Sequence, residues 1–318
     1  MKKLFIITIL IILSCSAFSQ EVIRDTLYGS NTLLHNRRDV THLTVLGKID
    51  ARTFKFMRDS LINLTYLDLS KAQIVAYEEI EETNPYWVYP KGRYDTIYYN
   101  ANEIPKNAFY HTHWGHPHLK KVILPEALIA VGREAFSNCK NLTSIEFSDN
   151  LKEIGISAFA SCKSLTSIEL PENLEKIRET AFVNCYGLTT IILSDSLKEI
   201  GIAALAWTGL TTITIPKNVS KIDTKAFEGN KFITTIIIPE NVKYIGDAVF
   251  KHCRNLQKIS LYWQNPELIS ISGCFFYDDD LIMRCVLEVP FGTREKYANL
   301  PVLKKYWLIV EREQEIKE

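Results

Sequence analysis

Four of the chain's seven histidines fall within eight residues, in the stretch YHTHWGHPH that runs from position 110 to 118. These histidines are His111, His113, His116 and His118. Closely spaced imidazoles can bind zinc, copper or nickel, which makes the stretch a candidate metal site. However, no nearby cysteine or carboxylate completes a familiar zinc ligand set, and we expect the imidazoles to be solvated in a surface turn. The histidines are therefore weak metal candidates, and the sequence predicts no cofactor.

Glu146 and Glu169 recur at one position of neighbouring repeats, and paired carboxylates can catalyse glycoside hydrolysis. We expect both to lie on an open sheet, without a pocket and without neighbours that would separate their pKa values. The sequence contains no serine elbow, Cys–His pairing, phosphate-binding loop or HExxH helix. It therefore favours a protein that is not an enzyme.

The first residues, MKKLFIITILIILSCSAFSQ, have the features of a secretory signal: Lys2 and Lys3, an apolar run too short to anchor in a membrane, and then small residues. Cleavage after Ser19 is favoured, and an imperfect lipid-attachment site at Cys15 is the alternative. No later apolar run is long enough to span a bilayer. We expect an exported protein, secreted or at the outer cell surface.

Loss of Lys2 and Lys3 would leave 37 − 2 = 35 basic residues against 37 acidic ones, so the remaining chain is nearly neutral. A neutral chain has no overall attraction for nucleic acid or anionic membrane. The sequence therefore predicts no nucleic-acid partner.

The middle of the chain is an internal repeat with the pattern LxxIxLPxxLxxIxxxAFxxCxx. Five of its six consecutive units have 23 residues and one has 22. The units are LKKVILPEALIAVGREAFSNCKN, LTSIEFSDNLKEIGISAFASCKS, LTSIELPENLEKIRETAFVNCYG, LTTIILSDSLKEIGIAALAWTG, LTTITIPKNVSKIDTKAFEGNKF and ITTIIIPENVKYIGDAVFKHCRN, from Leu119 to Asn255.

This period, with a short alternating strand followed by aliphatic positions that cannot be covered locally, predicts an α/β-type leucine-rich-repeat solenoid of short parallel strands. Alternation along LxxIxL points Ile168 and Leu170 inward, and a proline such as Pro171 ends the strand. The pattern resembles the BspA-like leucine-rich repeats of bacterial surface proteins, and the resemblance implies roles of the adhesion type.

Capping elements are expected at both ends, since a solenoid must close its exposed core. A helix should begin near Ala51 after the cap residue Asp50, and the last strand should be followed by a Pro-Phe-Gly turn and a short helix. The resulting segments are a signal peptide at 1–19, an N-terminal cap with first repeats and an aromatic insertion at 20–118, regular repeats at 119–261, and an atypical repeat, C-terminal cap and polar tail at 262–318.

Cys139, Cys162 and Cys185 occupy one repeat position and should stack on adjacent coils as small buried side chains rather than as a disulfide. Cys274 and Cys285 lie in the C-terminal region, where pairing with each other remains open.

Two places are candidates for binding a partner. The first is the outward face of the repeat strands, a hydroxyl-rich surface with scattered aliphatic side chains, although exposed-sheet propensity explains the same residues. Its members include Tyr66, Asp68, Lys121, Ile123, Glu146, Glu169, Ile192, Thr214, Ile237 and Ser260. The second is the aromatic-rich connection from Tyr77 to Tyr99, which includes Trp87 and Tyr89. This connection is either a hairpin or Ω-like excursion packed on the solenoid, or an aromatic platform for a protein or glycan. An exported scaffold that binds a surface protein is the leading hypothesis, and glycan capture by the insertion is the rival.

Overall fold

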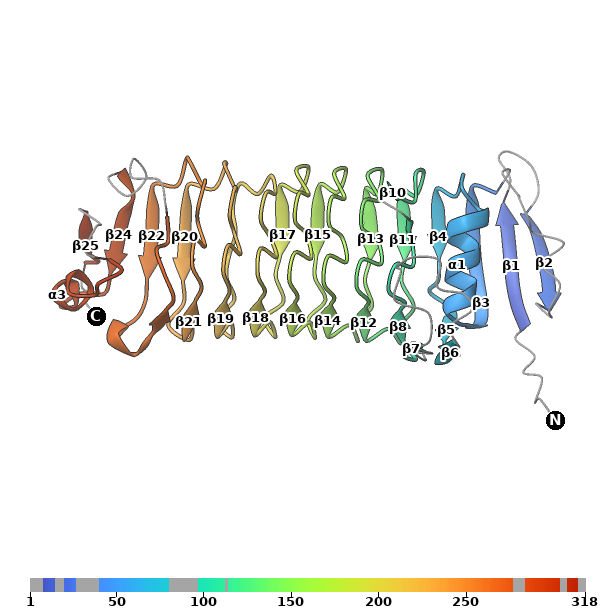
Figure 1. Ribbon diagram of the computed structural model, residues 1–318, viewed down its shortest axis with the longest axis horizontal. Helices are drawn as coiled ribbons and strands as arrows, with labels where there is room; N and C mark the ends of the chain where they lie inside the picture. The colour runs from blue at the N-terminus through green and yellow to red at the C-terminus, as the bar shows by residue number, and fades with distance from the viewer. Residues whose placement is uncertain are drawn as a thin grey trace, which may run out of the picture.

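The chain forms an elongated solenoid of stacked coils. Its N-terminus and C-terminus lie at opposite ends of the long axis (Figure 1). The computed structural model describes residues 40–79, 97–111, 114–276, 284–303 and 308–313, with only the backbone given for 8–14, 20–26, 79, 111 and 114. The solenoid is built from short parallel strands and contains little helix, so the predicted fold class is confirmed.

The N-terminal end consists of β3 (His42–Ile49), α1 (Ala51–Ser60), β4 (Tyr66–Asp68) and β5 (Ala72–Ile74). As predicted, α1 follows Asp50, whose carboxylate accepts a 3.0 Å hydrogen bond from the backbone N–H of Arg52. This bond satisfies one of the donors that the first helical turn leaves free. Phe54 and Met57 are the buried face of the helix.

Beyond β3 the sheet continues into β1 (Thr8–Ser14), which pairs antiparallel with β3 and with β2 (Gln20–Thr26). β1 falls inside the segment 1–19 that the sequence predicts to be cleaved. It therefore belongs to the precursor alone if that prediction holds.

Each regular coil contributes two strand positions, and the repeat pattern predicted a strand only at the first. The first strands are β11 (Lys121–Ile123), β13 (Ser144–Glu146), β15 (Ser167–Glu169), β17 (Thr190–Ile192), β20 (Thr235–Ile238) and β22 (Lys258–Leu261). The second strands are β8 (Glu103–Ile104), β12 (Ala130–Val131), β14 (Glu153–Ile154), β16 (Lys176–Ile177), β18 (Glu199–Ile200), β19 (Lys221–Ile222), β21 (Tyr244–Ile245) and β23 (Ser270–Ile271).

The second strands form one uninterrupted parallel sheet from β8 to β23, whereas the row of first strands is divided into separate ladders. One division falls at residues 212–214, which carry no strand although their pattern predicts one. This coil follows the 22-residue unit. Its Thr211 N–H donates to Thr189 O, whereas Thr189 and Thr190 both donate to Thr166 O in the coil before it. The second sheet is continuous here, where β18 pairs with β19.

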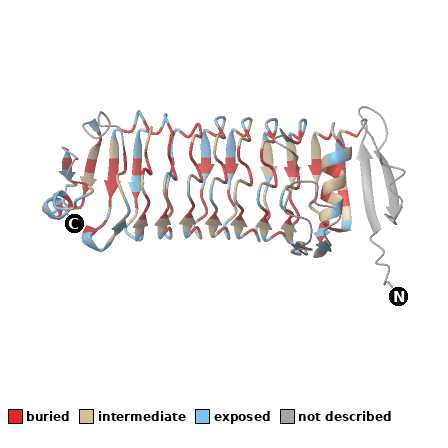
Figure 2. Ribbon diagram, viewed as in Figure 1, coloured by how far each residue is buried: buried red, intermediate tan, exposed pale blue. Residues whose placement is uncertain are grey.

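Stacked side chains fill the inside of the coils, while exposed residues gather at the turns (Figure 2). The phenylalanines of successive coils stack in parallel: the ring centres of Phe136 and Phe159 are 5.2 Å apart, and those of Phe159 and Phe182 are 5.4 Å apart. Leu205 interrupts this ladder in the short coil. Because the rings of Phe136 and Phe159 lie against the rings of both neighbouring coils, these coils cannot bury their phenylalanines alone.

The repeated cysteines are buried free thiols, as predicted. The Cys162 thiol donates to Phe136 O at 3.1 Å, and the Cys185 thiol donates to Phe159 O at the same distance. Each of these bonds ties one coil to the coil before it.

The C-terminal end contains η1 (Pro266–Leu268), β24 (Val286–Val289), α3 (Arg294–Ala298) and β25 (Ile309–Glu311). The strand, turn and short helix were predicted, and β25 was not. Tyr297 of α3 is buried, and its hydroxyl donates to Trp263 O at 2.8 Å. Cys274 and Cys285 are both free. Among the residues described, no helix has the length and apolar character needed to cross a membrane.

Candidate partner-binding surface

The first-strand face begins with a group of charged and aromatic side chains at its N-terminal end. In register, Lys121 lies between Tyr66 and Ser144, and Ile123 lies between Asp68 and Glu146. Lys121 Nζ is 2.6 Å from Glu146 Oε1 and 5.9 Å from the centre of the Tyr66 ring. The hydrogen bond to Glu146 raises the pKa of Lys121. In this part of the surface, the charge of Lys121 is therefore already paired with that of Glu146.

The middle of the same face is uncharged apart from Glu169. Ile192 and Ile237 are 55% and 51% exposed, and Thr214 is also exposed. Glu169 lies opposite Ile192 in the pairing of β15 with β17. A flat strip of hydroxyl and aliphatic side chains with no partner in the described residues can bury apolar area against another macromolecule.

At the C-terminal end other segments cover the face. The prediction that Ser260 points outward is wrong. Ser260 is buried, and its hydroxyl donates to Glu288 Oε2 at 2.6 Å. Lys258 and Arg312 lie 3.3 Å from the same carboxylate, whose pKa is lowered first of all by the Ser260 bond. β24 and the segment after β25 cover this position, which the repeat pattern could not reveal because both lie outside the regular coils.

The two carboxylates predicted on this face, Glu146 and Glu169, have different surroundings. Glu146 is paired with Lys121, while Glu169 lies on β15, outside the ladder that contains β13. Among the described residues, no three His, Cys, Asp or Glu side chains are grouped to hold a metal ion. A groove of about 310 Å³ near the C-terminal end is lined by Tyr262 and Leu268, among others, and by none of the predicted site residues.

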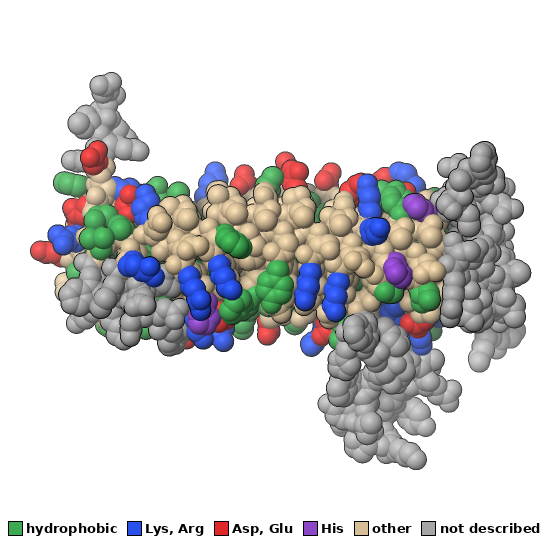
Figure 3. Space-filling model, turned by 90° about the horizontal axis from the view of Figure 1, so that it is seen from above, with side chains coloured by type: hydrophobic (Ala, Val, Ile, Leu, Met, Phe, Trp, Pro, Cys, Tyr) green, Lys and Arg blue, Asp and Glu red, His purple; other side chains and the backbone are tan. Residues whose placement is uncertain are grey.

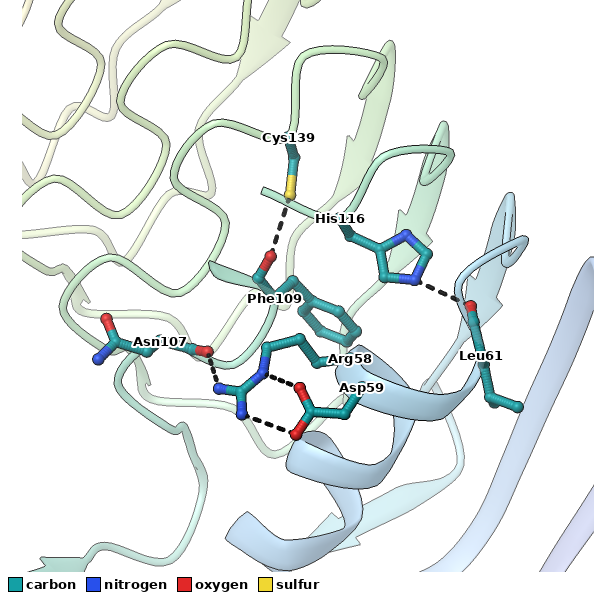
Figure 4. A network of polar contacts seen from close by, with 7 residues as sticks. All are labelled: Arg58, Asp59, Leu61, Asn107, Phe109, His116 and Cys139. Atoms are coloured by element: carbon teal, nitrogen blue, oxygen red, sulfur yellow. Dashed lines mark hydrogen bonds and ion pairs between the residues drawn. The ribbon is translucent and has the colours of Figure 1, made fainter. Parts of the chain in front are cut away.

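The expectation of solvated histidines is wrong for His116, which is only 2% exposed. Its Nε2–H donates to Leu61 O at 2.9 Å, at the C-terminal end of α1, and its ring meets Phe109 edge-on at 6.2 Å (Figure 4). In the same contact region Arg58 of α1 donates to Asn107 O at 3.0 Å. His116 thus joins the capping helix to the repeats.

His116 occupies the slot that cysteine occupies in regular coils. It precedes Leu119 by three residues, as Cys139 precedes Leu142, and a backward extension of the repeat would have found it. Among the described residues Nδ1 has no hydrogen-bond partner, and burial lowers the pKa of His116 to about 4. The ring is therefore a neutral structural group. His118 is exposed, only the backbone of His111 is described, and His113 lies outside the described residues.

The two ends of the aromatic connection pair as antiparallel strands, as the hairpin alternative of the prediction requires, and residues 80–96 lie outside the described residues. β6 (Tyr77–Glu79) pairs antiparallel with β7 (Ile97–Tyr99), and the rings of Tyr77 and Tyr99 stack at 6.2 Å. The Arg52 guanidinium lies 4.5 Å from the centre of the Tyr77 ring, while Tyr98 is 71% exposed. Trp87 and Tyr89 lie outside the described residues.

Stacked coils with two rows of short parallel strands are the architecture of a leucine-rich-repeat scaffold. The BspA-type leucine-rich repeat region matches residues 102–234 and 226–298 with six copies, and the chain belongs to this family. No curated protein matches the chain.

Several bacterial leucine-rich repeat structures are similar to this chain. One from Bacteroides ovatus is 17% identical with a TM-score of 0.48, and the match covers 93% of this chain and 72% of that chain. One from T. pallidum is 28% identical with a TM-score of 0.35, covering 50% of this chain and 65% of that one. A leucine rich cell surface protein from Faecalibacterium prausnitzii is 23% identical with a TM-score of 0.37, covering 61% and 65%.

Proposed function

We propose that this protein is an exported, non-enzymatic scaffold that binds a surface or extracellular protein through its first-strand face, in a role of the adhesion type. The observation that carries the proposal is the pair of half-exposed isoleucines, Ile192 and Ile237, on an otherwise hydroxyl-rich strip. Apolar side chains at the centre of a flat polar surface are the usual anchors of a protein interface. Tyr66, Asp68, Lys121 and Ile123 would form its charged margin, where rim charges steer association.

An array that carries both extracellular proteins and glycans tests the proposal. The double variant Ile192→Ser and Ile237→Ser should lose the protein ligand of the unaltered chain, because both anchors become polar. Ile202→Ser is the matched control, since Ile202 is 40% exposed but lies outside the first-strand face. Equal loss in both variants, or no protein ligand at all, would contradict the proposal.

Glycan binding through the aromatic insertion is the second candidate. It is supported by the β6–β7 base, where Arg52 and the stacked rings of Tyr77 and Tyr99 hold the insertion on the solenoid. On the same array, glycan binding that is lost on Trp87→Ala and Tyr89→Ala, with no protein ligand found, would replace the first candidate by this one.

We also propose that export depends on residues 1–19, with cleavage after Ser19 or lipid attachment at Cys15. Mass spectrometry of the N-terminal peptide from the exporting cell distinguishes these outcomes. An intact Met1 peptide on the exported protein would contradict both.

A further inference from the structure

The turn that contains the repeat cysteine carries a row of basic side chains. The residue after the cysteine position is Lys140, Lys163, Lys231 or Arg254 in four coils, and all four are exposed. Adjacent strands lie about 4.8 Å apart, and Lys140 and Arg254 are five coils apart, so the row is roughly 25 Å long. Among the described residues, Lys163, Lys231 and Arg254 have no ion pair with a carboxylate.

Acidic and basic side chains gather at different turns in most of the coils. The turn after the first strand is acidic in most coils, with Glu126, Asp149, Glu172, Asp195 and Glu240. The cysteine turns are 137–141, 160–164, 183–187, 206–209, 228–232 and 251–255. Their only acidic residue is Glu228, which is largely buried and 3.7 Å from Lys251. A nearly neutral chain thus has one strongly basic edge.

Aromatic side chains lie between the two basic pairs. Tyr186 takes the position after the cysteine in its coil and is 54% exposed, with Lys163 Nζ 5.6 Å from the centre of its ring. Trp207 of the short coil is half-buried, and Lys231 Nζ is 6.0 Å from its ring. Figure 3 shows a face of the solenoid on which Lys and Arg side chains recur along the long axis, with hydrophobic side chains between them.

We propose that this basic edge, defined by Lys140, Lys163, Tyr186, Trp207, Lys231 and Arg254, binds an anionic polysaccharide that lies along the solenoid axis. The basic side chains lie in a long row and do not converge on one point. Such a row suits a polymer that is bound at several points rather than a small molecule. Lysine is a flexible point charge and can pair with a carboxylate or a sulfate in many orientations.

The aromatic positions favour a polysaccharide over an acidic protein or a nucleic acid. The rings of Tyr186 and Trp207 give flat apolar surface with a polar edge, which matches the C–H face and the hydroxyls of a sugar ring. Their two coils bear no basic residue after the cysteine position, so the middle of the row fits a neutral sugar between charged ones. A nucleic acid carries a phosphate at every nucleotide and would leave charges unpaired there.

The test is binding of the purified protein to immobilised heparin and polygalacturonate, with neutral dextran and poly-dT as comparison polymers. The variant K140S/K163S/K231S/R254S should bind the anionic polysaccharide roughly 30-fold more weakly, because an exposed ion pair contributes about two- to threefold each. The control K106S/K152S/K217S/K243S removes four exposed charges elsewhere and should change affinity less than threefold. Tyr186→Ala should weaken binding about fivefold, by analogy with loss of one aromatic contact.

Heparin carries sulfates as well as carboxylates and polygalacturonate carries carboxylates alone, so tighter binding to heparin would point to sulfate recognition. Preference for either polymer supports the proposal. No binding to both, equal loss in the two quadruple variants, or tighter binding to poly-dT than to either polysaccharide would overturn it. The surface is separate from the first-strand face, so the Ile192→Ser and Ile237→Ser variant should retain full polysaccharide binding. Circular dichroism checks that each variant is folded.

Discussion

Protonation of His116 should weaken the attachment of the N-terminal cap. In the neutral ring Nε2–H donates to Leu61 O, and Nδ1 is buried with no acceptor among the residues that the structure describes. A proton on Nδ1 would place a charged N–H there with no partner. Burial therefore lowers the pKa from 6.5 to about 4, and the folded chain binds this proton less readily than the unfolded chain.

The sign and size of the effect follow from linkage. Stability is unaffected by His116 above pH 6.5, falls as the pH drops below 6.5, and reaches its full loss near pH 4. At about 1.4 kcal/mol per pKa unit, the full loss is about 3 kcal/mol, and roughly 2 kcal/mol is lost by pH 5.

Urea unfolding followed by circular dichroism, at pH 7.5 and pH 5, measures this loss. His116→Asn keeps a neutral donor in the slot, as Asn230 does in its own coil, where its Nδ2 donates to Leu205 O at 2.8 Å. The variant should lose about 2 kcal/mol less than the unaltered chain between the two pH values. His118→Asn, which changes an exposed neighbour, should behave like the unaltered chain. An equal pH dependence in all three proteins would refute the reasoning, and so would an NMR titration of His116 with a midpoint near 6.5.

Three further predictions concern the repeats and the cap. Phe159→Ala should lower the free energy of unfolding in urea by about 3 to 5 kcal/mol, because it removes a ring stacked on both neighbouring coils. Phe232→Ala, at a 58% exposed site, should change it by no more than about 0.5 kcal/mol. Similar losses in the two variants would argue against the phenylalanine ladder. Asp50→Ala should cost about 1 kcal/mol by removing the α1 cap, and an unchanged urea midpoint would show that the cap contributes nothing. Burial raises the pKa of the Cys139 thiol to about 12, so iodoacetamide at pH 8 should modify the half-buried Cys274 first and leave Cys139 unmodified until urea unfolds the chain. Peptide mass spectrometry checks the order, and early modification of Cys139 would contradict its burial.

Most of the fold could be predicted because equivalent positions of the repeats have the same local environment. The inward alternation of Ile168 and Leu170 and the cap at Asp50 depend on neighbours close in sequence, and all were predicted correctly. The continuous second sheet was missed because its strands are two residues long, too short for any alternation to be seen.

The candidate surface was only partly predictable, for the same reason. Repetition places Ile192 and Ile237 on the outward face, and the structure finds both exposed. Ser260 has the same repeat position but is covered by Glu288, which comes from a segment outside the regular repeats. A local pattern gives the direction in which a side chain leaves the strand, but it does not say what other segment lies over it.

The sequence by itself determined the family, the stacked coils and the buried cysteine column, because these follow from a period that recurs six times. Only the tertiary structure decided the environment of each irregular residue. His116 is the clearest case: its type and its three histidine neighbours indicated a solvated side chain and at most a weak metal candidate, yet α1 covers it and makes it a neutral structural group. Burial by a distant segment sets the charge of an imidazole, and one-dimensional spacing does not record that burial.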